Sequence, residues 1–370
     1  MKSKKKAVIS LFLAIFLLLS LSTPISAGNY GGHSPLRFNE DGTFTILQFT
    51  DTQDTQWPSP NLLTLLQKCL DESKPDLVVL TGDQLKNYDS DFGDTGHEWK
   101  VKKALYENIK PVIARGLPFA VAFGNHDSQL SFTLEEQVQY LQQFKGCLLV
   151  DEGAEISGCG NYNIPILSST GNEMVFNMYF LDSNQSQVLP DQIEWYVSKS
   201  NELTASNAGV PVPSIEFQHI VPHNELVSTF AAQGDIMASF FGHDHYRSDT
   251  VNQFGIDLVY TPTVGFNEFG PDMDRGARVI TLYENDTSTY DTHVLTFIGL
   301  LGNNPITDCR YTLFTLHALE GDLPVKALTV VTKITKALFY LRQTADGDIL
   351  FITKTLLAFF GVDVNLVACR

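Results

Sequence analysis

Metal-binding residue types follow five short apolar stretches of the chain. These residues are Asp51, Gly82-Asp83, Gly124-Asn125-His126-Asp127, His219 and Gly242-His243-Asp244-His245. Carboxylate and amide oxygens together with imidazole nitrogens suit two divalent cations side by side, because a carboxylate can bridge two ions and imidazole binds zinc, iron or manganese. Two ions ~3.5–4 Å apart can deprotonate a water and neutralise a phosphoryl group. The pattern therefore predicts metal-assisted hydrolysis at phosphorus.

The combination of motifs carries this prediction, since each motif alone is a weak signal. A single Asp or His is more often a surface or capping residue than a ligand, and Gly-Asp is common in turns. Gly124-Asn125-His126-Asp127 and Gly242-His243-Asp244-His245 are much rarer, and each follows an apolar stretch. Their occurrence in this order favours a metal site over coincidence. Ser128 and Ser183 lack a nucleophile-elbow context, which argues against a serine hydrolase.

The apolar stretches are predicted to be buried strands that alternate with helices. Strands are expected over 43–50, 77–80, 119–123, 175–181, 214–218 and 237–241, and helices over 61–73, 97–115, 134–144 and 190–203. Three further strands, 258–260, 278–283 and 292–297, are expected to close the domain as an antiparallel portion. This alternation favours a layered α/β domain whose strands are buried on both faces. Ligand sites in open α/β sheets form at the carboxyl ends of the strands, where the five motifs lie.

The five motifs resemble the signature of the calcineurin-like metallophosphoesterases, over roughly residues 43–300. Within that superfamily the chain is similar to short purple-acid-phosphatase-like enzymes that lack an extra N-terminal β-domain, and to related fungal phosphatases. Gly158-Cys159-Gly160-Asn161-Tyr162 also resembles a loop of that branch. The resemblance implies a mixed α/β (α+β) fold, a four-layer α-β-β-α sandwich.

The resemblance also implies a site with two divalent or trivalent ions, namely zinc, manganese or iron. It implies that Asp51, Asp83 and His245 bind the first ion. The second ion would be held by Asp83, Asn125, His219 and His243, with Asp83 bridging. His126 matches a histidine near the leaving group, so His126 and Asp83 are the predicted catalytic residues. The implied activity is hydrolysis of phosphomonoesters by in-line attack of a metal-bridging hydroxide.

Two positions depart from the family pattern. The family usually reads Asp-x-His in the first motif, whereas this chain reads Asp51-Thr52-Gln53. The carbonyl oxygen of Gln53 is a weaker ligand than imidazole. Three alternatives follow: Gln53 coordinates the first ion, Asp54 coordinates it in place of Gln53, or the first ion is loosely held. Lys86 stands where purple enzymes carry an iron-binding tyrosine, so no iron–tyrosinate centre is expected. The alternatives are a phosphodiesterase on the same fold and a degenerate, metal-poor binding protein.

Several polar residues near the motifs are expected to have roles other than metal binding. His223 lies four residues after His219, but Pro222 disfavours a regular helix between them, so His223 is expected at the surface or on the substrate side. Asp127 and Asp244 are expected to orient ligands rather than to bind metal. Arg247 could contact a phosphate or lie in a solvated loop. These positions therefore stay outside the predicted ligand set.

The composition narrows the class of partner. The chain has 370 residues, with 25 Lys and Arg against 42 Asp and Glu, a net charge of −17. This charge argues against nonspecific nucleic-acid binding, which depends on basic patches. The expected partner, a phosphorylated substrate, follows from the metal motifs and the family resemblance. A metallophosphoesterase domain is expected over 28–301. Residues 302–370 form an extension that is basic from 323 onward, with a helix expected over 323–342 that either docks on the main domain or lies on a membrane or partner.

The N-terminus is typical of a secretory signal peptide spanning residues 1–27. A lysine-rich start precedes the apolar run 7–21, and small residues follow up to Ala27. The run is shorter than the ~20 residues of a spanning helix, so no stable transmembrane anchor is expected after cleavage, although an uncleaved signal anchor is the alternative. The protein is expected in the secretory pathway, as a secreted or vacuolar/lysosomal glycoprotein. Sequons at Asn184 and Asn285 and a local Cys147–Cys159 bridge would suit that environment.

Overall fold

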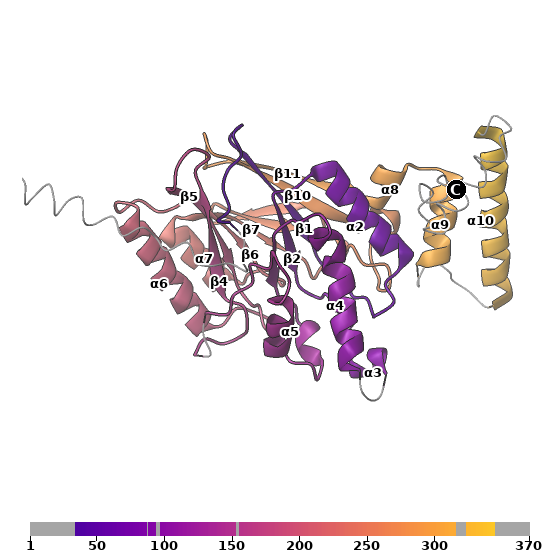
Figure 1. Ribbon diagram of the computed structural model, residues 1–370, viewed down its shortest axis with the longest axis horizontal. Coiled ribbons are helices and arrows are strands. Elements are labelled where there is room, and N and C mark those ends of the chain that lie inside the picture. The colour runs from indigo at the N-terminus through magenta and orange to yellow at the C-terminus, as the bar shows by residue number, and fades with distance from the viewer. Residues whose placement is uncertain (1–33, 87, 94–96, 153–154, 316–322, 345–370) are drawn as a thin grey trace, which may run out of the picture.

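Two β-sheets packed face to face form the centre of the protein, and helices cover their outer sides (Figure 1). The computed structural model describes residues 34–86, 88–93, 97–152, 155–315 and 323–344. This is the four-layer α-β-β-α arrangement of a mixed α/β protein, so the predicted fold class is confirmed. The predicted signal peptide lies outside the described residues.

The first sheet has the strand order β11-β10-β1-β2-β3. Its strands are β1 (Thr43–Phe49), β2 (Leu77–Thr81), β3 (Phe119–Ala122), β10 (Gly276–Tyr283) and β11 (Tyr290–Thr296). Strands β1, β2 and β3 are parallel, β10 pairs antiparallel with β1, and β11 pairs antiparallel with β10, so 278–283 and 292–297 form an antiparallel portion as predicted. The crossover helices are α2 (Pro60–Ser73) and α4 (Glu98–Ile113), with the short α3 (Asp89–Phe92) before α4 and α5 (Leu134–Leu141) after β3.

The second sheet has the order β4-β5-β6-β7-β9-β8. Its strands are β4 (Tyr162–Leu167), β5 (Met174–Phe180), β6 (Ser214–Phe217), β7 (Ile236–Phe241), β8 (Thr250–Gln253) and β9 (Ile256–Tyr260). Strands β5, β6, β7 and β9 run parallel. Helices α6 (Pro190–Ser206) and α7 (Asn224–Gln233) connect them. The expected antiparallel role of 258–260 is confirmed in part, because β9 pairs antiparallel with the unpredicted strand β8 but parallel with β7, and it lies in the second sheet rather than beside β10 and β11.

A ladder of stacked aromatic rings holds the second sheet against the first. Tyr162 stacks on Phe180 at 4.6 Å between ring centroids, and Phe180 stacks on Phe217 at 5.3 Å. Phe240 continues the ladder at 5.6 Å from Phe217. These rings belong to one buried core with residues of β1, β2 and β3. Such close packing fixes the two sheets, and therefore the ends of their strands, relative to each other.

Two cysteines differ from expectation. Cys147 and Cys159 are both buried free thiols, so the predicted local bridge is absent from the structure. The backbone explains the placement of Cys159, whose N–H donates to Asp182 Oδ2 at 2.8 Å and so draws the residue toward the end of β5. Burial raises the pKa of Cys147 to about 12, which keeps it protonated and unreactive.

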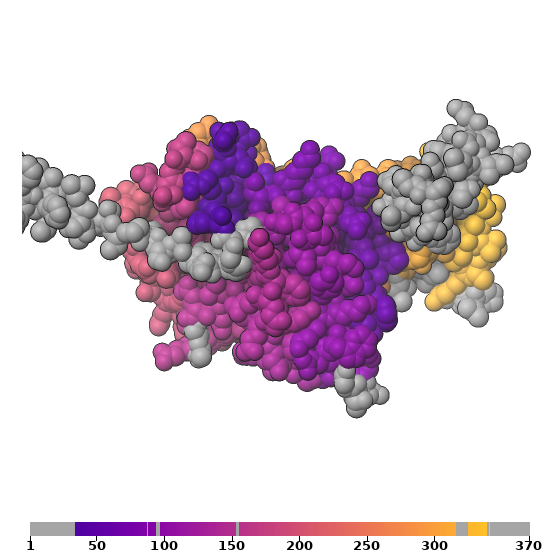
Figure 2. Space-filling view, viewed as in Figure 1, coloured from indigo at the N-terminus to yellow at the C-terminus, as the bar shows by residue number. Residues whose placement is uncertain are grey.

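The C-terminal extension begins with helices docked on the main domain. After α8 (Phe297–Leu301), α9 (Pro305–Phe314) is fixed to α2 by Arg310, which donates to Asn61 Oδ1 at 3.0 Å. The predicted helix is α10 (Leu323–Thr344), which packs on α9 and forms one end of the molecule (Figure 2). An ion pair between Lys333 and Asp308 joins the two helices. Within the described residues, no helix is long and apolar enough to cross a membrane.

Candidate metal centre

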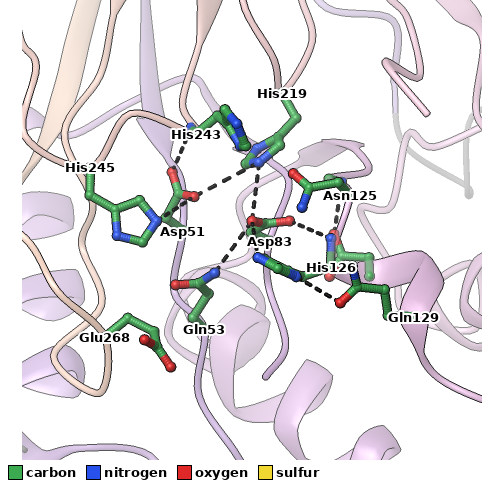
Figure 3. A network of polar contacts seen from close by, with 12 residues as sticks. Asp51, Gln53, Asp83, Asn125, His126, Gln129, His219, His243, His245 and Glu268 are labelled. Carbon is green, nitrogen blue, oxygen red and sulfur yellow. Dashed lines mark hydrogen bonds and ion pairs between the residues drawn. The ribbon is translucent and has the colours of Figure 1, made fainter. Parts of the chain in front are cut away.

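The carboxyl ends of five parallel strands meet at one edge of the two sheets. Asp51, Asp83 and the Asn125-His126 pair follow β1, β2 and β3 of the first sheet, and His219 and His243 follow β6 and β7 of the second (Figure 3). The structure thus brings together all the residues predicted as ligands. Because strand ends are rigid, their side chains are positioned before any ligand binds.

The first corner of the site contains Asp51, Gln53 and His245. His245 Nε2 lies 3.2 Å from Asp51 Oδ1, while its Nδ1 lies 2.7 Å from the Phe269 carbonyl oxygen. That carbonyl accepts the Nδ1 proton and leaves Nε2 as the free donor atom. Burial raises the pKa of Asp51, but His219 and His245 outweigh it and lower the pKa to about 2. Asp51 is therefore a carboxylate across the physiological range.

The second corner contains Asp83, Asn125, His219 and His243. His219 Nε2 lies 3.2 Å from Asp83 Oδ2, and its Nδ1 lies 2.8 Å from the Thr81 carbonyl oxygen. Ligand atoms of Asp83, His219 and His243 all lie within 4.8 Å of one another. Burial lowers the pKa of His219, but Asp83 and Asp51 outweigh it and raise the pKa to about 10. The carboxylates of this site therefore create a strong local preference for positive charge.

Buried polar atoms without hydrogen-bond partners test whether metal ions fit this centre. Gln53 Oε1 and Asn125 Oδ1 have no hydrogen-bond partner, and Asp51 Oδ1 and His219 Nε2 have only the 3.2 Å ion-pair contacts to His245 and Asp83 described above. An unpaired buried polar atom costs about 1–3 kcal/mol, so the two amide oxygens need a compensating partner. Oxygen and imidazole donors are the atoms that bind zinc, manganese and iron. The residues present therefore fit two metal ions.

Strained backbone accompanies the ligands. Asp51, Gln53, Asp83 and His243 all have positive φ, between 37° and 66°. Each such non-glycine residue costs about 1–3 kcal/mol and persists only where the surrounding structure requires it. Such strain clusters at functional sites, because it turns a side chain out of the strand direction toward a ligand.

Glycines next to the ligands leave the space that the carboxylates occupy. A Cβ atom on Gly124 would lie 2.2 Å from Asp83 Oδ1, and one on Gly242 would lie 2.5 Å from Asp51 Oδ2. A Cβ on Gly82 would lie 2.7 Å from His219 Nδ1. Each distance is far below van der Waals contact. Only glycine at these positions therefore allows both corners to form.

Gln53 and Asp54 have different roles in the first corner. Gln53 is buried, and its Nε2 lies 3.3 Å from Asp83 Oδ2, where it can donate, while Oε1 has no hydrogen-bond partner. Asp54 turns into the following loop, where Oδ2 accepts from Ser59 N at 2.8 Å and Oδ1 accepts from Asn267 at 2.6 Å. The alternative that Asp54 serves as the metal ligand in place of Gln53 is therefore wrong, because both oxygens of Asp54 accept hydrogen bonds that hold the loop.

His126 lies at the accessible side of the centre. Its backbone N–H donates to Asp83 Oδ1 at 2.8 Å, its Nε2 is 3.8 Å from Asp83 Oδ2, and its Nδ1 is 2.8 Å from Gln129 Oε1. The side chain is 24% exposed, so a bound molecule can reach it. Sequence reasoning missed Gln129, although its position three residues after His126 in a turn places it within reach.

Asp127 orients the site without entering it, as predicted. Its two oxygens accept from Gln84 N and Gly124 N, each at 2.9 Å, which ties the loop after β2 to the loop after β3. Burial, reinforced by Asp83, raises its pKa to about 7. Asp244 accepts from Tyr246 N at 3.3 Å and shapes the turn between His243 and His245.

Other histidines and cations lie apart from the ligands. His223 is the N-cap residue before α7, where its side chain accepts from Leu226 N, and its Nε2 lies 3.0 Å from the Val188 carbonyl oxygen. Arg247 donates to Asp249 at 2.6 Å and lies over the ring of Tyr260. Lys86 forms an ion pair with Glu268, which Figure 3 shows on the Gln53 side of the centre.

Residues 44–247 match the family model of the calcineurin-like phosphoesterases, which covers more than half of the chain. The chain belongs to this family. A relative, "Probable inactive purple acid phosphatase 28" of Arabidopsis thaliana, is 25% identical over 312 residues, covering 66% of this chain and 77% of the relative. "Phosphatase DCR2" of Saccharomyces cerevisiae is 30% identical over 174 residues, covering 42% of this chain and 29% of the relative.

Two solved structures are similar in fold. A dimetal phosphatase from Danio rerio aligns with a TM-score of 0.44 at 14% identity, covering 69% of this chain and 99% of that structure. A purple acid phosphatase from yellow lupin (Lupinus luteus) seeds aligns with a TM-score of 0.43 at 15% identity, covering 73% of this chain and 56% of that structure.

Proposed function

We propose that this protein is a dinuclear metal-dependent phosphoesterase that hydrolyses phosphomonoesters. The observation that carries the proposal is the convergence of buried ligand atoms of Asp51, Gln53, Asn125 and His219 around the carboxylate of Asp83, with the amide oxygens of Gln53 and Asn125 left without hydrogen-bond partners. Asp51, Gln53 and His245 would hold the first ion with Asp83. Asn125, His219 and His243 would hold the second, again with Asp83. Two such ions supply a hydroxide nucleophile and neutralise the phosphoryl group.

The chain's own groups contribute positioning and proton transfer. His126 reaches solvent at the rim, and its Nδ1 contact with Gln129 fixes the orientation of the ring. We assign His126 to the leaving group, where an imidazole N–H can donate a proton to the departing oxygen. The Thr81 and Phe269 carbonyls fix the tautomers of His219 and His245. These supports keep the site in one geometry, which is how rigid positioning lowers a reaction barrier.

The second candidate is a metal-poor binding protein. It is favoured by Gln53, whose amide stands where the family pattern has a histidine. The names of some relatives contain the word "inactive", including that of purple acid phosphatase 28 of Arabidopsis thaliana. In this chain, however, the Gln53 amide is buried beside Asp83, with Nε2 3.3 Å from Asp83 Oδ2 and an oxygen that has no hydrogen-bond partner and can bind an ion when the amide turns, which supports coordination rather than decay. A phosphodiesterase is the third candidate and differs only in substrate.

Elemental analysis of the purified full-length protein, combined with an assay on phenyl phosphate, tests the proposal. We expect two equivalents of metal and turnover that chelation abolishes. The assay is repeated with a phosphodiester, and faster turnover of the diester would favour the phosphodiesterase. Absence of metal after incubation with zinc, manganese and iron would overturn the proposal and support the binding protein.

We also infer that the protein enters the secretory pathway, on the basis of its lysine-rich and apolar N-terminus. Of the two sequons, Asn285 is exposed between β10 and β11. Asn184 Nδ2 donates to the Asp182 carbonyl at 3.2 Å and to Gln192 Oε1 at 2.8 Å. A glycan is therefore expected at Asn285, and mass spectrometry of glycopeptides from a eukaryotic host would show whether it is there.

A further inference from the structure

Two exposed aromatic rings extend outward from the first corner of the metal centre. Phe269 stacks on His245 at 4.3 Å between ring centroids with 20° between the planes. Tyr246 lies 6.1 Å from Phe269, also at 20°. Phe269 is 56% exposed and Tyr246 is 59% exposed. These two residues, which we call the aromatic platform, present flat apolar surface to solvent beside a ligand of the centre.

The loop that carries Phe269 is held in place by contacts on several sides. The Phe269 carbonyl accepts from His245 Nδ1 at 2.7 Å, and Arg275 Nη2 donates to the Glu268 carbonyl at 2.8 Å. Lys86 Nζ donates to the Asn267 carbonyl at 2.9 Å. The exposed ring of Phe269 is therefore fixed before anything binds, which reduces the entropy lost when a partner stacks on it.

The topology separates the platform from ordinary exposed aromatics. Tyr246 and Phe269 follow the carboxyl ends of β7 and β9, the edge at which the metal centre lies. Phe254, which is 61% exposed, lies in the turn before β9 and therefore at the opposite edge of the same sheet. An exposed aromatic beside a ligand-binding edge can contact a bound molecule, whereas Phe254 cannot.

The charges around the platform indicate what kind of group it accepts. Two positively charged side chains of these loops already form ion pairs within the protein, Lys86 with Glu268 and Arg247 with Asp249. Asp244 adds a further acidic group beside Tyr246. A second phosphate would be repelled here, whereas a neutral planar ring would gain stacking and lose little solvation.

We propose that Phe269 and Tyr246 bind the planar aromatic group of the substrate, so that the enzyme prefers aryl or nucleoside phosphomonoesters to aliphatic ones. The inference rests on the proposed phosphomonoesterase function and adds its substrate class. The ester phosphate would lie at the metal centre, and the ring of the alcohol portion would stack on the platform. Such stacking is sequence-tolerant for nucleobases, because every base has a flat face.

Binding of two phosphonates that cannot be hydrolysed tests the platform independently of turnover. Benzylphosphonate and methylphosphonate are titrated calorimetrically into the metal-loaded full-length protein. We expect benzylphosphonate to bind about tenfold tighter, and Y246A to remove this preference without changing methylphosphonate affinity. F269A should also remove the preference, but its methylphosphonate affinity is not used as a reference because the Phe269 ring stacks on His245. F254A, the matched exposed aromatic at the other edge, should leave both affinities unchanged. F269W should retain the preference, because it restores a flat ring.

Equal affinity of the two phosphonates for the wild-type protein would overturn the inference, as would a loss of both affinities in Y246A. If benzylphosphonate is preferred but no phosphomonoester is hydrolysed, the platform stands and the proposed function fails. If phosphomonoesters are hydrolysed, hydrolysis assays identify which class of substrate supplies the aromatic ring. A Y246A defect with phenyl phosphate alone indicates an aryl substrate, and a defect with adenosine monophosphate indicates a nucleotide, with glycerol phosphate as the unaffected reference.

Discussion

The two corners of the metal centre are built alike but are not equally complete. The second corner has two imidazoles, an amide oxygen and the shared Asp83, and ligand atoms of Asp83, His219 and His243 already cluster within 4.8 Å. The first corner has Asp51, His245 and the amide of Gln53. Amide oxygen binds transition metals more weakly than imidazole does. We therefore expect the second ion to be held more tightly than the first.

The supports behind the two corners differ in the same direction. The Nδ1 of His219 is fixed by the carbonyl of Thr81, the last residue of the buried strand β2. The Nδ1 of His245 is fixed by the carbonyl of Phe269, which lies in a loop. A strand in the core opens less readily than a surface loop. Ligand type and local rigidity together therefore make the first corner the more adaptable one.

The largest effect is expected from Asp83→Asn, because Asp83 belongs to both corners. The change removes the bridging charge, so both ions should be lost and phenyl phosphate turnover should fall by at least about a thousandfold. Metal content per chain and turnover are the measurements. Asp235→Asn is the matched control, since Asp235 is a buried carboxylate bound to Tyr196 and Tyr179 away from the centre. Retention of two ions by Asp83→Asn would contradict the assigned bridge.

Removing one histidine from each corner should separate them. His219→Ala should lose the second ion, and His245→Ala should lose the first, each with turnover reduced by about a hundredfold or more. Metal titration with a competing chelator gives the affinity of each ion in each variant. His223→Ala is the control, because His223 caps α7 and contacts the Val188 carbonyl. If both variants lost both ions together, the two corners would form one cooperative unit instead.

The strand-end geometry explains how much of this site could be predicted from the sequence. Apolar runs such as 77–80 mark buried strands, and parallel strands bring their carboxyl ends to one edge, so Asp83 and His219 could be placed together without a structure. Strand β4 was missed because Pro165 interrupts its pattern, and proline is tolerated there since β4 is an edge strand.

Loops were the part that could not be predicted. The carbonyl of Phe269 and the ion pair of Lys86 with Glu268 depend on a loop whose course is fixed by tertiary contacts, notably those of Arg275. The sequence also gives no signal that Asp54 is not a metal ligand. Only the structure shows that its two carboxylate oxygens accept hydrogen bonds from Ser59 and Asn267. Backbone and side-chain contacts of this kind are formed between residues distant in sequence.

Gln53→His should make the ligand sets of the two corners alike. An imidazole in place of the amide should raise the affinity for the first ion by about tenfold to a hundredfold, while the second ion keeps its affinity. Competition titration measures the affinity of each ion. A large rise in turnover would show that the natural site is degraded, whereas unchanged turnover would show that Gln53 is an adapted ligand.

The smallest effect on the centre is expected from Glu216, a fully buried carboxylate on β6 that has no cation partner. Its Oε2 accepts from Ser239 Oγ at 2.5 Å, its Oε1 has no hydrogen-bond partner, and burial raises its pKa to about 8. Burial alone therefore raises the pKa of a carboxylate, whereas His219 and His245 lower that of Asp51. The folded state holds a proton that the unfolded chain has released above pH ~4.5, so Glu216 makes stability fall as pH rises from ~4.5 to ~8.

Glu216→Gln should remove that pH dependence and stabilise the protein near pH 8 by a few kcal/mol, since one pKa unit corresponds to about 1.4 kcal/mol. Urea denaturation between pH 5 and pH 8 measures it, with the exposed Glu202→Gln as control. Metal content and turnover should not change, because Glu216 faces the helix side of its sheet with Ser239. Loss of metal in Glu216→Gln would mean that the centre depends on buried charge beyond its two corners.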